Sequence, residues 1–150
     1  MIEYTVRVYE DGTKEWFLNG LRHREDGPAI EHADSDKSWW FDGNLHREDG
    51  PAIEHANGNK SWWFNGKRHR EDGPAIEHAN GTKEWWLNGN LHREDGPAIE
   101  YAGGTKSWWF NDEELTEDEW RAKVQPQPSC DGKVVEIEGK KYKLVECLDN

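Results

Sequence analysis

A segment of 23 residues recurs along most of the chain, and this repetition limits the fold more than any other feature of the sequence. Repetition at a fixed period is typical of an array in which each unit contacts only its neighbours. The string His-Arg-Glu-Asp-Gly-Pro-Ala begins at His23, His46, His69 and His92. Aromatic pairs recur with it at Trp16-Phe17, Trp39-Trp40, Trp62-Trp63, Trp85-Trp86 and Trp108-Trp109. The fold is therefore predicted one unit at a time.

Each unit has the pattern of a β-hairpin. In the third unit Asn57-Gly58 separates residues 52–56 from residues 59–64. Asn-Gly between two such runs is the strongest short hairpin signal, because both residues tolerate positive φ. A two-residue turn there places Ile53 opposite Trp62.

The alternation of side chains along these strands predicts which aromatic residues are buried. In the expected register Ile53 and Trp62 share the more apolar face. We therefore expect a buried tryptophan stripe with isoleucines between its members, and a second aromatic row, from Phe17 to Trp109, that is exposed. The expected stripe consists of Trp16, Trp39, Trp62, Trp85 and Trp108, with Ile30, Ile53, Ile76 and Ile99 interleaved.

The fold class expected from these units is mainly β, an elongated antiparallel array of 23-residue β-hairpin repeats with a short C-terminal helix and a terminal hairpin. An open ribbon and a closed solenoid remain alternatives. Thr116-Glu117-Asp118-Glu119 is a capping-box pattern that predicts a helix start, with Trp120 docked on the last repeat. A turn at Gly139-Lys140 predicts Ile137 opposite Tyr142. The expected segments are a capping strand (1–9), the repeats (10–111), a capping helix (112–124), a linker (125–132) and a hairpin (133–147).

Charge and composition exclude several classes of partner. The formal net charge is -12, whereas binding to duplex nucleic acid or to an anionic membrane depends on clustered Lys and Arg. The start of the chain lacks a secretory pattern and no apolar run is long enough to cross a bilayer, so we expect a cytoplasmic protein. Cys130 and Cys147 are the only cysteines, and no disulfide framework is predicted.

The repeats resemble the MORN repeat, a hairpin unit of the same length whose hallmark is an aromatic residue, then glycine, then histidine. Trp63-Phe64-Asn65-Gly66-Lys67-Arg68-His69 carries this hallmark, which recurs from Phe17, Trp40 and Trp86. Glycine commonly follows the histidine in MORN units, whereas arginine stands there in this chain. This variant is similar to repeats in uncharacterised proteins of bacteriophages, giant viruses and bacteria. The resemblance, from about Glu10 to Asn111, implies an interaction, dimerisation or scaffold module.

The His-Arg-Glu-Asp string holds residue types that serve acid–base and metal chemistry. A reaction centre, however, needs one pocket with unlike groups, whereas this string occurs in four equal copies beside turn residues. We interpret it as a set of ion pairs and hydrogen bonds that fix each loop, and we expect no catalytic residue, no metal and no cofactor. A second histidine of each unit is replaced by Tyr101 in the last unit, which favours a packing role.

Two rows of side chains are the candidate binding residues. The exposed aromatic row would supply apolar contacts to a partner, and an adjacent row of arginines could stack on a nucleotide and clamp it. The candidates are Trp40, Trp63, Trp86, Trp109, Arg24, Arg47, Arg70 and Arg93.

The leading functional prediction is a non-enzymatic repeat scaffold for protein–protein interaction, such as a viral protein that binds a host factor. The first alternative is a sequestering protein that holds a nucleotide-type ligand between the Arg and Trp rows. The second is an acidic mimic of nucleic acid. Unpaired strand edges at the ends of a hairpin array also predict a homo-oligomer.

Overall fold

The computed structural model describes residues 3–125 and 134–143. The chain divides into two compact units, Met1–Trp120 and Arg121–Asn150, and each is described by itself. Most of the predicted linker (125–132) lies outside the described residues. The same is true of Cys130 and Cys147.

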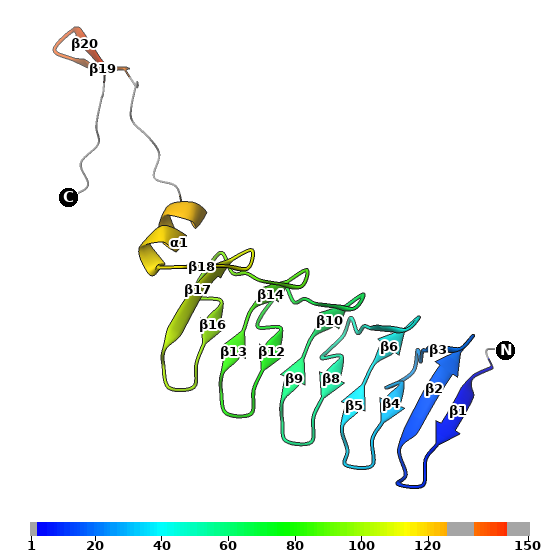
Figure 1. Cartoon of the computed structure of the whole chain (residues 1–150). Helices are drawn as coiled ribbons and strands as arrows, with labels where there is room; N and C mark the ends of the chain where they lie inside the picture. The colour runs from blue at the N-terminus through cyan, green and yellow to red at the C-terminus, as the bar shows by residue number, and fades with distance from the viewer. Residues whose placement is uncertain (1–2, 126–133, 144–150) are drawn as a thin grey trace. The chain divides into compact units, whose positions relative to one another are not determined.

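The first unit is built around one open antiparallel sheet of 12 strands (Figure 1). The order of its main path is β1-β2-β4-β5-β8-β9-β12-β13-β16-β17-β18, with β3 paired to β2. Each repeat adds its hairpin beside the preceding one, so the predicted mainly-β array is confirmed in its open form. The strands are β1 (Thr5–Val8), β2 (Lys14–Leu18), β3 (Leu21–Arg22), β4 (Ile30–Glu31), β5 (Lys37–Ser38), β8 (Ile53–Glu54), β9 (Lys60–Ser61), β12 (Ile76–Glu77), β13 (Lys83–Glu84), β16 (Ile99–Glu100), β17 (Lys106–Phe110) and β18 (Glu113–Leu115).

The turn of the main hairpin differs from the predicted two-residue turn. His55 N–H donates to the carbonyl of Asn59, and Gly58 N–H donates to the carbonyl of His55, both at 2.9 Å. Gly58 has φ +94°, so the loop has three residues and ends in a glycine bulge. Ile53 therefore pairs with Ser61 rather than with Trp62, and the predicted register is wrong by one residue.

Each complete repeat also forms a second, smaller hairpin that the sequence interpretation missed. In the third repeat β10 (Trp63–Phe64) pairs with β11 (Lys67–Arg68). Asn65 and Gly66 between them have φ +48° and +77°, the signature of a type I′ turn. The equivalent hairpins are β6 (Trp40–Phe41) with β7 (Asn44–Leu45), and β14 (Trp86–Leu87) with β15 (Asn90–Leu91).

The shift in register exchanges the roles of the two aromatic rows, because a slip of one residue moves a side chain to the other face. Ile53 shares the face of Ser61, whose hydroxyl accepts the indole N–H of Trp63 at 2.8 Å. Between the fourth and fifth repeats, Trp86 and Trp109 pack on the buried cluster of Leu91, Ala98 and Ile99. The expectation that the isoleucines interleave with the Trp62 row is therefore wrong: they pack with the Trp63 row.

Adjacent repeats are joined at their hairpin turns by a hydrogen bond that the sequence pattern does not predict. A side-chain oxygen of one repeat accepts the backbone N–H of an alanine in the next. Asp36 accepts from Ala56 at 2.7 Å, and Asn59 accepts from Ala79 at 2.8 Å. Thr13 and Thr82 act in the same way toward Ala33 and Ala102. Each repeat thus fixes the turn of its neighbour.

The expected short helix is present as α1 (Glu117–Val124), but the predicted bounds 112–124 are too wide, because Glu113–Leu115 form β18. Thr116 N–H donates to Glu119 Oε2 at 2.8 Å, and Glu119 N–H donates to Thr116 Oγ1 at 3.3 Å, which completes the capping box. Trp120 is buried, its indole N–H donates to the carbonyl of Arg93 at 2.8 Å, and its ring lies 4.6 Å from that of Trp108. The last repeat is therefore covered by Trp120.

The second unit contains the expected terminal hairpin, β19 (Val134–Ile137) with β20 (Lys140–Lys143). Its turn residues are Glu138 and Gly139, both at positive φ. Val135 pairs with Tyr142, so the predicted partner Ile137 is wrong by two residues. Across the described parts of the chain, no helix combines the length and apolar character needed to span a bilayer.

Replacing Trp120 with alanine should destabilise the array at its last repeat by about 3–5 kcal/mol, the usual cost of removing a large buried aromatic ring. Trp120→Phe keeps an aromatic ring against Trp108 but loses the bond to Arg93 and part of the buried ring, so it should cost less, about 1–3 kcal/mol. Urea unfolding gives both values. In Trp120→Ala, the backbone amides of β17 should lose protection from hydrogen exchange before those of β2 do. Equal loss of protection in both strands would contradict a local capping role.

Candidate functional site

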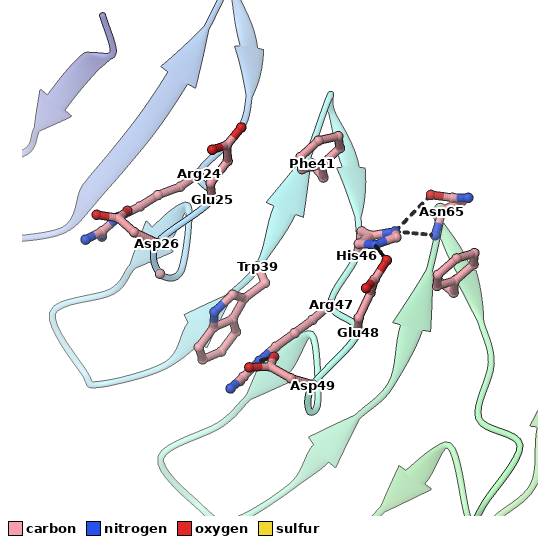
Figure 2. A pocket seen from close by; sticks show the side chains of 12 residues that line it. Arg24, Glu25, Asp26, Trp39, Phe41, His46, Arg47, Glu48, Asp49 and Asn65 are labelled. Atoms are coloured by element: carbon pink, nitrogen blue, oxygen red, sulfur yellow. Dashed lines mark hydrogen bonds and ion pairs between the residues drawn. The ribbon is translucent and has the colours of Figure 1, made fainter. Parts of the chain in front are cut away.

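The loop that follows each second hairpin is held by its arginine (Figure 2). The guanidinium of Arg47 lies over the ring of Trp39, with Cζ 4.0 Å from the ring centroid. Its Nε donates to Asp49 Oδ1 at 2.8 Å, and its Nη1 donates to Glu54 Oε1 at 2.9 Å and to the carbonyl of Pro51 at 3.2 Å. A cation–π contact and three hydrogen bonds therefore fix one side chain.

The same arrangement recurs in all four loops, which confirms the interpretation of the string as loop-fixing contacts. The arginine side chains are only 18% to 22% exposed. The glycine of the motif leaves room for the guanidinium, because a Cβ at Gly50 would lie 2.9 Å from Arg47 Cζ. The other stacked pairs are Arg24 on Trp16 at 4.1 Å, Arg70 on Trp62 at 4.1 Å and Arg93 on Trp85 at 3.9 Å.

The arginines also shift the acidity of the loop aspartates. The side-chain hydrogen bond from Arg47, together with its positive charge, lowers the pKa of Asp49 below its ordinary value. Arg24 and Arg70 lower the pKa of Asp26 and Asp72 in the same way. These carboxylates therefore stay ionised in the folded protein at neutral pH.

The histidine of each motif holds the second hairpin of the next repeat. Nδ1 of His46 accepts the backbone N–H of Asn65 at 3.2 Å, and His69 and His92 accept from Asn88 and Asn111. Nδ1 of His46 also lies 2.8 Å from the side-chain oxygen of Asn65. Both contacts engage Nδ1, so the histidine stabilises the type I′ turn of the next repeat.

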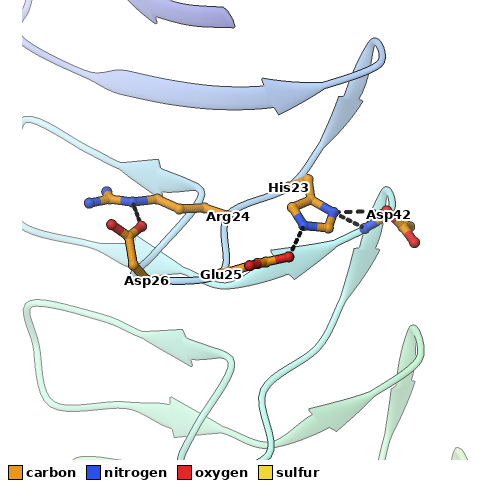
Figure 3. A network of polar contacts seen from close by, with 5 residues as sticks. All are labelled: His23, Arg24, Glu25, Asp26 and Asp42. Carbon is orange, nitrogen blue, oxygen red and sulfur yellow. Dashed lines mark hydrogen bonds and ion pairs between the residues drawn. The ribbon is translucent and has the colours of Figure 1, made fainter. Parts of the chain in front are cut away.

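At the first loop the histidine contacts two carboxylates (Figure 3). Nδ1 of His23 lies 2.8 Å from Asp42 Oδ1, and its Nε2 lies 3.8 Å from Glu25 Oε1. Asp42 occupies the turn position that asparagine holds in the later repeats. His23 itself is buried, with 3% of its surface exposed.

The glutamate is the motif residue that the loop structure uses least. Its carboxylate lies 3.4 to 3.8 Å from Nε2 of the motif histidine, which is too long for a good hydrogen bond. These side chains are between 56% and 84% exposed. The sequence interpretation overlooked them as site residues. They are Glu25, Glu48, Glu71 and Glu94.

Open hollows lie between successive loops, and the glutamates border them. The first has a volume of about 850 Å³ and is lined by Trp39, Phe41 and Phe64 together with the acidic residues of two loops. The second, of about 830 Å³, lies one unit further along and is lined by Trp62, Phe64 and the charged residues of two loops. Phe41 and Phe64 are 42% and 43% exposed. In each hollow, aromatic side chains lie beside four carboxylates and two guanidinium groups.

We call this surface the loop edge. It consists of residues 23–26, 46–49, 69–72 and 92–95 with Phe41 and Phe64.

The sequence-predicted binding residues fall into two groups that the structure separates. The motif arginines lie at the loop edge, but they stack on the Trp16 to Trp85 row, whereas the sequence analysis expected them beside the second row, where they would clamp a ligand; they are Arg24, Arg47, Arg70 and Arg93. Trp40, Trp63, Trp86 and Trp109 are half-buried in the sheet. Their indole N–H groups donate to Ser38, Ser61, Glu84 and Ser107.

Comparison with known proteins does not assign a family. The sequence matches no protein-family model and no curated protein. Among residues 3–125 and 134–143, no group of three or more His, Cys, Asp or Glu side chains is placed to hold a metal ion. The chemistry of the loop edge is therefore inferred from its own geometry.

Arg70→Ala should lower the free energy of unfolding by about 2–4 kcal/mol, because it removes the stacked cation and leaves Asp72 and Glu77 without their donor. Arg70→Lys keeps the charge but cannot form the planar fork, so it should recover less than half of this loss. Lys60→Ala, at an exposed position, should change stability by less than about 0.5 kcal/mol. Urea denaturation measures all three, and full recovery by lysine would contradict the role of the fork.

The stability of the array should fall in acid. The pKa values of Asp26, Asp49 and Asp72 lie below the ordinary value of 3.8 in the folded state. A lowered folded pKa stabilises the protein above pH 3.8, and this contribution is lost as the pH falls through the folded pKa. Asp26→Asn/Asp49→Asn/Asp72→Asn should therefore show a weaker dependence of thermal midpoint on pH below 3.8. An unchanged dependence would show that the arginine bonds do not set these pKa values.

Proposed function

We propose that this protein is a non-enzymatic repeat scaffold that binds a basic segment of another protein through the loop edge. The observation that carries the proposal is the motif glutamate, which recurs in four exposed copies without a structural role that requires it. Exposed carboxylates at a regular interval attract a partner with complementary charge. The resemblance of the repeats to MORN repeats supports the same class of function.

The hollows between the loops fit a lysine or arginine side chain. Such a side chain has an aliphatic stem that covers aromatic surface and a charged head that stays at the rim. The first hollow offers Phe41 and Phe64 to the stem, and Glu25 and Glu48 to the head. A cation over an aromatic face gains further from the ring quadrupole.

The interval between hollows supports an extended partner. Each repeat contributes two strands to the main sheet, so successive loops are roughly 9.5 Å apart. Three residues of a polyproline II segment span about 9.3 Å. A peptide with a basic residue at every third position therefore matches one side chain to each hollow.

The geometry supports a protein partner over the two alternatives. A nucleotide clamp needs arginine donors that are free to bind phosphate, whereas Nε and Nη1 of each motif arginine already donate to carboxylates. A nucleic-acid mimic needs a dense file of negative charge, because duplex DNA carries about one charge per 1.7 Å of its axis. The loop edge presents one motif glutamate per step of roughly 9.5 Å, and the aspartate of each loop is paired with an arginine. The aromatic side chains of the hollows also suit an aliphatic stem better than a phosphate chain.

The test uses two synthetic peptides of equal composition, one with lysine at every third position and one with its lysines contiguous. Fluorescence anisotropy at low ionic strength should show tighter binding of the spaced peptide. Glu48→Gln/Glu71→Gln should weaken that binding by about twofold to thirtyfold, since each exposed ion pair contributes about 0.2–1 kcal/mol.

The matched control is Glu10→Gln/Asp34→Asn, which removes the same charge at hairpin turns away from the loop edge. Asp34 is a suitable choice because Asn57 and Asn80 occupy the equivalent turn position. This control should bind as the unmodified protein does. Absence of binding by either peptide would contradict a basic partner, and equal losses in both variants would place the contact outside the loop edge.

A further inference from the structure

The outer edge of β1 is the end of the main sheet, and none of the described strands pairs with it. All four residues of β1 are exposed. Val6 and Val8 are 44% and 67% exposed, and the adjacent Tyr9 is 45% exposed. A free edge of this kind presents backbone donors and acceptors together with apolar side chains, which is the usual template for pairing with another strand.

The bonds within the first hairpin show which backbone groups face outward. Tyr9 N–H donates to the carbonyl of Thr13 at 2.9 Å. Because bonded and non-bonded positions alternate along an antiparallel ladder, Thr5 and Arg7 direct their backbone groups toward β2. Tyr4, Val6 and Val8 then direct theirs to the free edge. An added strand must therefore pair these outward residues with outward residues of its own.

We propose that β1 pairs antiparallel with β1 of a second copy of this chain, which gives a symmetric dimer. Pairing centred on Thr5 sets Tyr4 opposite Val6, so outward groups meet outward groups. The same register places Glu3 of each copy opposite Arg7 of the other, at a non-bonded position where side chains approach most closely. The strand is thus complementary to itself in charge.

The neighbouring registers that preserve the outward pattern lack this match. Centring on Val6 sets Thr5 opposite Arg7 and leaves no opposite charges across the pair. Centring on Arg7 sets the two arginines against each other, which is unfavourable. The charge pattern therefore selects the register centred on Thr5.

Two-fold symmetry explains why pairing through β1 stops at two copies. Pairing through a two-fold axis consumes the β1 edge of both copies, so no equivalent edge remains for a third copy. The main sheets of the two copies then form one continuous sheet.

The experiment is charge reversal followed by its compensation, read by sedimentation velocity over a range of protein concentration. The unmodified chain should be dimeric. Glu3→Arg and Arg7→Glu should each weaken dimerisation by at least about tenfold, because each places like charges opposite each other twice. The double variant Glu3→Arg/Arg7→Glu should restore the dimer. Circular dichroism reports whether each variant stays folded.

Val6→Pro provides an independent probe of the edge. It removes a backbone N–H that faces outward, so it should abolish dimerisation while the β1–β2 pairing persists. A monomer at all concentrations, or a dimer that none of these substitutions weakens, would overturn the proposal. Failure of the double variant to restore a dimer that both single variants weaken would overturn the register. These outcomes are independent of peptide binding at the loop edge.

Discussion

The stacking of each motif arginine on a tryptophan is the interaction on which the repeat depends. In the second loop the Arg47 guanidinium covers Trp39 and at the same time binds Asp49, Glu54 and the carbonyl of Pro51. One side chain thus connects a loop, a strand and the aromatic row. Where the array ends and the motif does not recur, the ring of Trp120 lies against Trp108 in place of a motif arginine. At the last repeat, a contact between two tryptophan rings therefore replaces the arginine–tryptophan stacking of the earlier repeats.

A chain with only 33% hydrophobic residues can form this structure because its interior is distributed along the array. The motif alanines Ala29, Ala52, Ala75 and Ala98 are fully buried, while the large rings are half-buried. Ion pairs and cation–π contacts cover the remaining faces of those rings. The charged residues are therefore part of the packing, which a composition-based estimate of the core does not take into account.

The sequence predicted the elements better than their register. The 23-residue period, the capping box at Thr116 and the docking of Trp120 could be predicted because each depends on local spacing. The face of the sheet could not, because both Asn57-Gly58 and Asn65-Gly66 have the composition of a type I′ turn and only the second forms one. The first closes through a glycine bulge, which shifts Ile53 by one position and exchanges the two aromatic rows. The exposed glutamates were not predicted as site residues, because the repeated motif does not show which of its residues lacks a hydrogen-bond partner in the folded loop.

The contacts between repeats join residues about one unit apart in the sequence, as at Ala56 and Asp36 or His46 and Asn65. No described bond between repeats requires distant parts of the array to meet, so the entropy of loop closure is the same for every added unit. Each unit also displaces its loop by the same step along the sheet. The number of repeats can therefore change by whole units without requiring a new kind of contact. Each repeat gained or lost then changes the distance between the first and last loop by one fixed increment.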